Sequence, residues 1–214
     1  MTACASSHLF LVLVAASAWS ADEPVASGPV VLITAFKPFA QRKVNGSETV
    51  AEALRKDLPG VQVKVLVLEV GWKEPSAKLP LMAQKLRPRV LIGLGEGAVG
   101  SVMVEQVAHN YRVGPDVFGQ PPADRLVERG GPLERRSTLA FNTAWQLSRE
   151  IAVASSDDAG DYLCNALFYT ALGDLGVAVE RVGFVHLPPQ GNEDDKDYSD
   201  RFVPILRELI ERNL

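Results

Sequence analysis

The stretch Val30-Val31-Leu32-Ile33-Thr34 decides the fold class, because an unbroken β-branched and apolar run is typical of a strand buried on both faces. Similar runs follow at residues 61–70, 89–94 and 181–187, and shorter extended segments are predicted at 102–107 and 151–154. The spacing of apolar residues predicts helices between them, at 49–58, 76–86, 141–149, 156–172 and 199–212. Strands that alternate with helices predict an α/β fold whose largely parallel sheet is covered on both faces.

The composition is that of an ordinary globular chain. Of its 214 residues 47% are apolar and 22% are charged, which suits one domain with a sizeable core. The formal net charge is -4, and no block of Lys or Arg stands out. We therefore expect no nucleic-acid partner and no anionic-membrane partner.

The N-terminus differs in kind from the rest of the chain. Residues 9–18 form an apolar run too short to span a membrane, small residues flank Trp19, and the chain then turns polar. This pattern predicts a cleaved export signal at residues 1–20, a linker at 21–28 and one domain at 29–214. The mature protein would then be periplasmic or secreted, without stable membrane insertion. The absence of Lys or Arg before the run argues against this, and an uncleaved anchor or a misassigned start is the alternative.

The chain has two cysteines, Cys4 and Cys164. Once the signal is removed, Cys164 has no partner for an internal disulfide and no companions for a thiolate metal site. It is then either an inert buried residue or a reactive thiol. Capping candidates at 156–158 place it in the first or second turn of a helix, where unpaired N–H groups favour a thiolate. Asp161 would oppose that charge if it points the same way.

Two further residues could serve a reactive thiol. His186 ends the apolar strand at 181–187, and histidine is the usual general base for a thiol. Glu105 interrupts the apolar run at 102–107, where a buried charge needs a partner. It could orient the imidazole as the third member of a triad. The alternatives are a core imidazole for His186 and a solvent-facing edge carboxylate for Glu105.

Five segments resemble, in order, the motifs of one family. Residues 33–39 followed by 45–47 are similar to ITGFxPFxxxxxNPS, 104–110 to xERVAxN, and 115–119 to PDNxG. Residues 159–165 are similar to AGxxxCN, and 183–188 to GFIHxP. These motifs are those of the pyroglutamyl-peptidase I family, also called pyrrolidone carboxyl peptidases. The resemblance covers about residues 30–190.

The resemblance implies a three-layer αβα sandwich with a mixed, mostly parallel central sheet. It implies a hydrolase, a thiol protease that releases N-terminal pyroglutamate from peptides without a metal or cofactor. Glu105, Cys164 and His186 match the family's catalytic residues. Phe36 and Phe39 match the aromatic residues that sandwich the pyrrolidone ring, and a flat, neutral lactam suits an apolar slot. Core packing is the alternative for these two phenylalanines.

Two more matched positions, Asn45 and Asp116, are expected on the substrate side of the site. The family is often tetrameric, and the sequence leaves a homo-oligomer open. The expected partner is a peptide with N-terminal pyroglutamate.

Several departures from the family pattern surround the expected substrate slot. Ala35 replaces a glycine, Gly46 a proline and Gln106 an arginine, while residues 93–101 lack the family's glutamine and arginine. The departures leave two alternatives open. One is a related cysteine hydrolase of another blocked or lactam acyl group, and the other is a pyroglutamyl-binding protein without turnover.

Overall fold

The computed structural model describes residues 28–214, so the predicted export signal at 1–20 lies outside the described residues. Its elements are, in chain order, β1 (Val30–Phe36), α1 (Gly46–Asp57), β2 (Gln62–Leu68), α2 (Lys73–Leu86), β3 (Val90–Glu96), β4 (Ser101–Glu105), β5 (Val107–His109), β6 (Glu134–Arg136), η1 (Thr143–Trp145), β7 (Ala152–Ser156), α3 (Leu163–Ala171), β8 (Arg181–Leu187) and α4 (Asp195–Glu211). No helix in this part of the chain is long and apolar enough to cross a membrane.

One six-stranded sheet organises the described chain, in the order β2-β1-β3-β8-β4-β7. Neighbouring strands are parallel except for β4 and β8, which run antiparallel. A separate two-stranded ribbon pairs β5 with β6. The prediction of a mixed, mostly parallel sheet is therefore confirmed.

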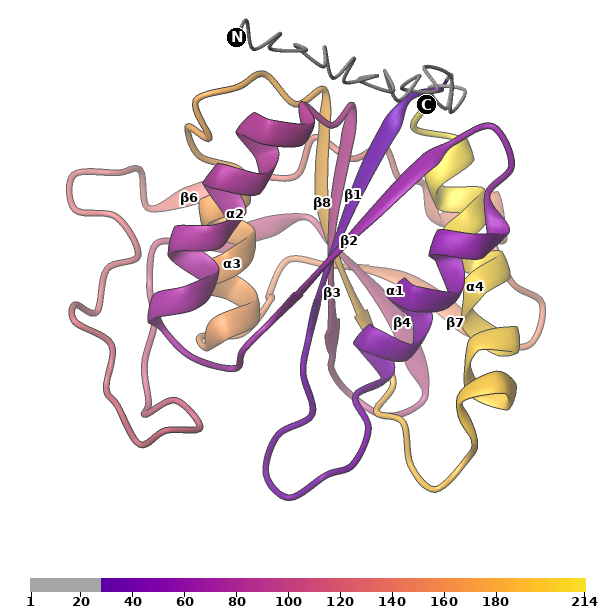
Figure 1. Cartoon of the computed structure of the whole chain (residues 1–214), viewed down its shortest axis with the longest axis horizontal. Coiled ribbons are helices and arrows are strands. Elements are labelled where there is room, and N and C mark those ends of the chain that lie inside the picture. Colours follow the sequence, from indigo (N-terminus) through magenta and orange to yellow (C-terminus); the bar gives the residue numbers. More distant parts are fainter. Residues whose placement is uncertain (1–27) are drawn as a thin grey trace, which may run out of the picture.

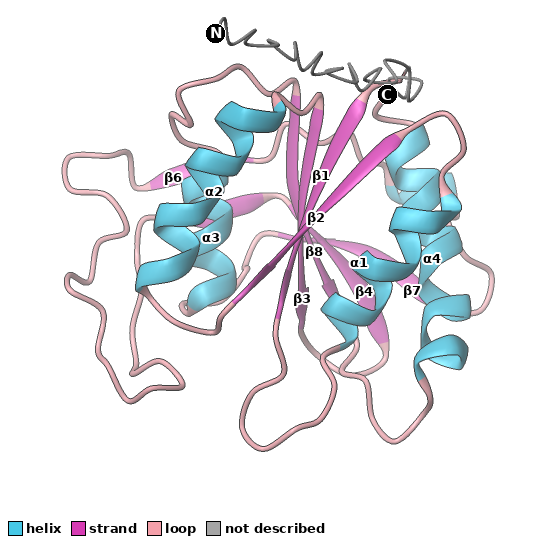
Figure 2. Ribbon diagram, in the orientation of Figure 1, coloured by secondary structure: helices cyan, strands magenta, loops and turns pink. Residues whose placement is uncertain are grey.

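Helices cover both faces of the sheet, α1 and α4 on one side and α2 and α3 on the other (Figure 1). The same view by secondary structure shows the three layers αβα (Figure 2). Along β1, Val31, Ile33 and Ala35 join the apolar cluster under α1 and α4, while Leu32 and Phe36 join the cluster under α2 and α3. The run that decides the fold class is continuously apolar because its two alternating sets of side chains are both buried.

Two helix predictions are wrong. Residues 141–149 form only the short 3-10 turn η1, because Gln146 is left-handed at φ 48° and the Ser148 hydroxyl accepts the N–H groups of Glu150 and Ile151. The helix predicted from residue 156 begins at Leu163 instead.

The delayed start of α3 has a local cause. β7 continues to Ser156, and the Asp158 carboxylate accepts from the N–H of Gly160. Gly160 is left-handed at φ 80°, which breaks any helix through the turn. The capping candidates at 156–158 therefore cap nothing, and α3 begins after Tyr162.

Candidate active site

Cys164 is the second residue of α3, so it lies in the first helical turn. The N–H groups of that turn have no partner within the helix, and the helix dipole is most positive there. The side chain is half-buried and not in a disulfide. The shorter helix therefore brings Cys164 closer to the helix N-terminus than the predicted helix would.

Three glycines at alternate positions make room for Cys164, His186 and Phe184. A Cβ on Gly95 would stand 2.9 Å from Cys164 Sγ, and one on Gly97 would stand 2.8 Å from the Cβ of His186. A Cβ on Gly93 would stand 2.4 Å from the ring of Phe184. Since strand side chains alternate between faces, all three glycines open the α3 side of the sheet. Residues 93, 95 and 97 thus carry no side chain on this face of the strand end, which leaves room for its neighbours.

His186 and Glu105 meet across the antiparallel pair of β8 and β4. Met103 stands opposite His186 and Glu105 opposite Phe184, so Glu105 is the diagonal neighbour of His186 on one face. His186 Nδ1 lies 2.8 Å from Glu105 Oε1. Glu105 is only 1% exposed, and its other oxygen, Oε2, has no hydrogen-bond partner within the described chain. A buried carboxylate in this position orients the imidazole ring.

The environment of His186 holds it in the protonated form. Burial lowers its pKa, but the hydrogen bonds to Cys164 and Glu105 and the charges of both partners outweigh burial and raise the pKa from 6.5 to about 10. At neutral pH an imidazolium is therefore favoured at His186, which lines the same cavity as Cys164.

A cavity of about 440 Å³ opens onto this constellation. Cys164, His186 and Glu105 line it together with Glu96, and the turn 156–162 contributes two exposed carboxylates, Asp158 and Asp161, to its wall. A second cavity of about 550 Å³ is lined by Trp72, Arg112, Asp116 and Phe118. The two are neighbours, because the Trp72 ring meets that of Tyr162, which lines the first cavity, at a centroid distance of 5.1 Å.

The two predicted ring-binding phenylalanines do not line the cavity of Cys164. Phe36 is part of the apolar cluster under α2 and α3, and Phe39 and Cys164 both pack against that cluster. Phe36 is 4% exposed, so most of its ring is buried in the core.

The predicted substrate residues Asn45 and Asp116 have their polar atoms engaged within the protein. Asn45 caps α1, accepting from the N–H and hydroxyl of Ser47 and donating to the carbonyl of Lys37 at 3.1 Å. Asp116 accepts three backbone N–H groups, from Trp72, Phe118 and Gln120. Desolvation raises the pKa of Asp116, but these three bonds lower it below its ordinary value.

Two groups that support the site were not predicted. Asn165, buried in α3 beside Cys164, accepts from His109 N at 2.8 Å and donates to the carbonyls of His109 and Tyr111. It ties the start of α3 to the chain around β5. Glu96, at the end of β3, forms an ion pair with Arg42. An amide inside an apolar helix and a charge at the end of an apolar strand are the signals that could have identified them.

Comparison with known proteins adds to this geometry. The model of a family described as pyroglutamyl peptidase matches residues 30–206. The pyrrolidone-carboxylate peptidase of Thermococcus kodakarensis is 32% identical over 165 residues, covering 74% of this chain and 80% of that protein. Its counterpart in Clavibacter michiganensis is 34% identical over 199 residues, covering 87% of this chain and 93% of the relative.

A solved structure shares the architecture. A mutant pyrrolidone carboxyl peptidase from the hyperthermophile Pyrococcus furiosus superposes with a TM-score of 0.74 at 25% identity, covering 86% of this chain and all of that one (100%). The arrangement of strands and helices around Cys164 is thus similar to that of a known peptidase.

Proposed function

The chain belongs to the pyroglutamyl peptidase family, and from that premise we propose that it is a cysteine exopeptidase that hydrolyses N-terminal pyroglutamate from peptides. One observation carries the proposal: Cys164 lies in the first turn of α3 and lines one cavity with His186, whose Nδ1 is 2.8 Å from Oε1 of Glu105. These are the nucleophile, the acid–base group and the orienting carboxylate that acyl transfer to sulfur requires.

The first half of the proposed reaction forms a thioester. The Cys164 thiolate attacks the pyroglutamyl carbonyl carbon, and the resulting oxyanion is stabilised by backbone N–H groups at the start of α3. The imidazolium of His186 then gives its proton to the leaving amine as the C–N bond breaks. The raised pKa of His186 favours the imidazolium that delivers this proton.

The second half releases the acid. Neutral His186 takes a proton from water, the hydroxide attacks the thioester carbonyl, and the C–S bond breaks to release pyroglutamate and the Cys164 thiolate. Glu105 keeps the ring oriented and stabilises the imidazolium in both halves. These steps use side chains and backbone groups of this chain and water.

We assign the lactam ring to the apolar side of the site. Phe36 and Phe39 support this assignment, because they belong to or pack on the same cluster as Cys164. Asn45 and Asp116 act indirectly in this proposal. Asn45 holds the start of α1 and Asp116 orders the loop at 116–120, because their polar atoms are engaged by the protein itself.

The test is release of fluorophore from a pyroglutamyl aminomethylcoumarin. Wild-type protein is expected to turn it over, and Cys164→Ala is expected to be inactive while folding normally. Equal release from both proteins would contradict the proposal. Turnover confined to other N-terminally blocked peptides would indicate a related hydrolase, and saturable binding of the pyroglutamyl amide without turnover would indicate a binding protein.

We also propose that residues 1–20 direct export, that 21–28 form a linker, and that the domain at 29–214 acts in the periplasm or outside the cell. The apolar run at 9–18 and the polar turn after it support this assignment. Mass spectrometry of the purified protein should find the N-terminus near residue 21, with activity in the extracytoplasmic fraction. An intact Met1 in a cytoplasmic fraction would contradict it.

A further inference from the structure

Three segments of the chain meet at the carboxylate of Glu96, whose side chain is only 5% exposed. Its Oε1 accepts the N–H of Gly46 at 2.8 Å and the N–H of Gln190 at 2.9 Å. Arg42 pairs with both of its oxygens, Nη2 reaching Oε1 at 2.9 Å. A buried charge with these partners is fully satisfied, so removing it would leave several donors without an acceptor.

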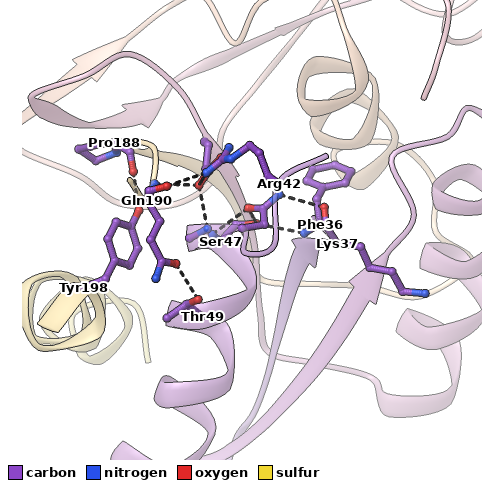
Figure 3. Close-up of polar contacts among 11 residues, drawn as sticks. Phe36, Lys37, Arg42, Ser47, Thr49, Pro188, Gln190 and Tyr198 are labelled. Atoms are coloured by element: carbon purple, nitrogen blue, oxygen red, sulfur yellow. Dashed lines mark hydrogen bonds and ion pairs between the residues drawn. The ribbon is translucent and has the colours of Figure 1, made fainter. Parts of the chain in front are cut away.

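The network continues beyond the ion pair into α1 and α4 (Figure 3). Arg42 Nη2 also donates to the carbonyl of Gln190 at 2.8 Å. The Gln190 side chain in turn accepts from the Thr49 hydroxyl and donates to Asp195, both at 2.8 Å. The loop at 37–45 is thereby tied to the connection between β8, the strand that carries His186, and α4.

The loop at 37–45 is strained where it turns. Ala40 and Gln41 are both left-handed, at φ 51° and 64°, although neither is glycine. Such residues persist only where their surroundings hold them, and they concentrate at functional sites. Arg42 closes the turn through its N–H to the carbonyl of Phe39 at 3.0 Å, and its guanidinium lies 5.8 Å from the Phe39 ring centroid.

The anchor of this loop lies beside the site: Glu96 stands between Gly95 and Gly97, and its carboxylate meets Gly46 on the other face of the sheet. Glu96 lines the cavity that holds Cys164 and His186. The next residue, Gly97, donates to the carbonyl of Leu187 at 2.8 Å and leaves room for His186. One carboxylate therefore joins the strained loop that carries Phe39 to the strand ends that carry the reacting groups.

We propose that Glu96 and Arg42 are positioning residues that hold the 37–45 loop, and with it Phe39, against the apolar cluster on which Cys164 also packs, and so determine how tightly the acyl ring binds. The inference rests on the proposed function, because it assumes that Phe39 contacts the acyl ring. It concerns the side chains of Glu96 and Arg42 and the loop that they hold. None of these takes part in the bond-making or bond-breaking steps of the proposed reaction.

The first experiment separates binding from chemistry. Glu96→Gln keeps the shape of the side chain and removes its charge, so KM for the pyroglutamyl amide is expected to rise about tenfold or more while kcat changes by less than about threefold. Arg42→Met should do the same, and the double variant should resemble either single variant, because one interaction is lost in all three. Lys37→Met, which breaks the exposed pair between Lys37 at the start of the loop and Glu69 after β2, is the matched control and should leave KM unchanged.

Rescue distinguishes positioning from general destabilisation. Adding Ala40→Gly and Gln41→Gly to Glu96→Gln removes the left-handed strain and should recover about threefold or more of the lost KM. Glu96→Asp keeps the charge and should lie between wild type and Glu96→Gln, even if the glutamine variant folds poorly. An unchanged KM in Glu96→Gln, or kcat and KM that follow thermal stability alone, would overturn the proposal.

A second readout does not depend on turnover. Trypsin should cut after Lys43 about tenfold faster in Glu96→Gln than in wild type, because the loop opens more often. If wild type fails to hydrolyse the amide, the proposed function fails while this measurement still tests the anchor. A raised KM without faster cutting would also overturn the inference, because Glu96 would then act on the substrate directly.

Discussion

Replacing Glu105 with glutamine removes one buried charge from the site and almost nothing else. Glutamine has the same shape, and its side-chain oxygen can still accept the hydrogen bond that His186 Nδ1 makes at 2.8 Å. The orientation of the ring should therefore survive, while the electrostatic support for the imidazolium is lost. The variant isolates the part of the mechanism that depends on charge.

The magnitude follows from the pKa of His186. Burial lowers this pKa, and the contacts with Cys164 and Glu105 raise it, from 6.5 to about 10. One pKa unit corresponds to about 1.4 kcal/mol, so the imidazolium is favoured by roughly 5 kcal/mol. Cys164 makes the larger raising contribution and Glu105 the next, so Glu105→Gln should lower the pKa by about one to two units.

The raised pKa of His186 determines the direction in which activity and stability change with pH. The imidazolium, and the stability it contributes, is fully present below about pH 6.5 and is lost as the pH rises through about 10. In Glu105→Gln the alkaline limb of kcat/KM should move down by about one to two pH units. At pH 7 the loss of a charge-assisted hydrogen bond should lower kcat/KM by roughly 10- to 150-fold.

The assay is kcat/KM for the pyroglutamyl amide between about pH 5 and 11, with the rate of Cys164 alkylation by iodoacetamide measured over the same range. Glu180→Gln is the matched control, because it breaks an exposed ion pair with Arg89 at the opposite end of β3 and β8. The control should keep the wild-type profile. An alkaline limb that stays in place in Glu105→Gln, with kcat/KM within about twofold of wild type, would refute the reasoning that the carboxylate charge supports His186.

Three further changes test the surroundings of Cys164. Gly95→Ala places a Cβ 2.9 Å from Cys164 Sγ and should lower kcat/KM by about tenfold or more, whereas Gly191→Ala, with nothing within 4 Å, should match wild type in the same assay. Asn165→Ala removes three buried hydrogen bonds and should lower the free energy of unfolding in urea by about 2–4 kcal/mol; a loss below about 1 kcal/mol would contradict its role in tying down α3. Asp161→Asn removes an exposed carboxylate from the cavity wall and should speed alkylation of Cys164 at pH 6 by about two- to threefold at low salt, an effect that about 1 M salt should abolish.

Much of the fold could be predicted because hydrophobic periodicity is a local property. The run at 181–187 was predicted as a strand and is β8 with the same bounds, and the run at 30–34 lies within β1. The predictions failed where polar side chains override periodicity. Ser148 and Asp158 each bind backbone N–H groups in turns that the apolar pattern does not reveal.

For the candidate site, the sequence predicts which residues could take part but not which groups they contact. A lone thiol, a histidine at a strand end and a carboxylate in an apolar run are visible in the sequence, and the structure brings all three together. The engagement of Asn45 and Asp116 by backbone groups could not be predicted, because their partners depend on how two loops fold. The role of the glycines that make room for Cys164 and His186 could not be predicted either, because it depends on the pairing of β3 with β8.

The sequence by itself determined the alternation of strands and helices, the two buried faces of the sheet, and which side chains could carry chemistry. Only the tertiary structure decided that β4 runs antiparallel to β8, and this pairing places Glu105 diagonally beside His186 although 81 residues separate them. It also decided that Glu96 meets Arg42 and that α3 begins one residue before Cys164. The physical reason is that periodicity records which face of an element is apolar, whereas register and pairing depend on contacts between distant segments that form only when the chain is folded.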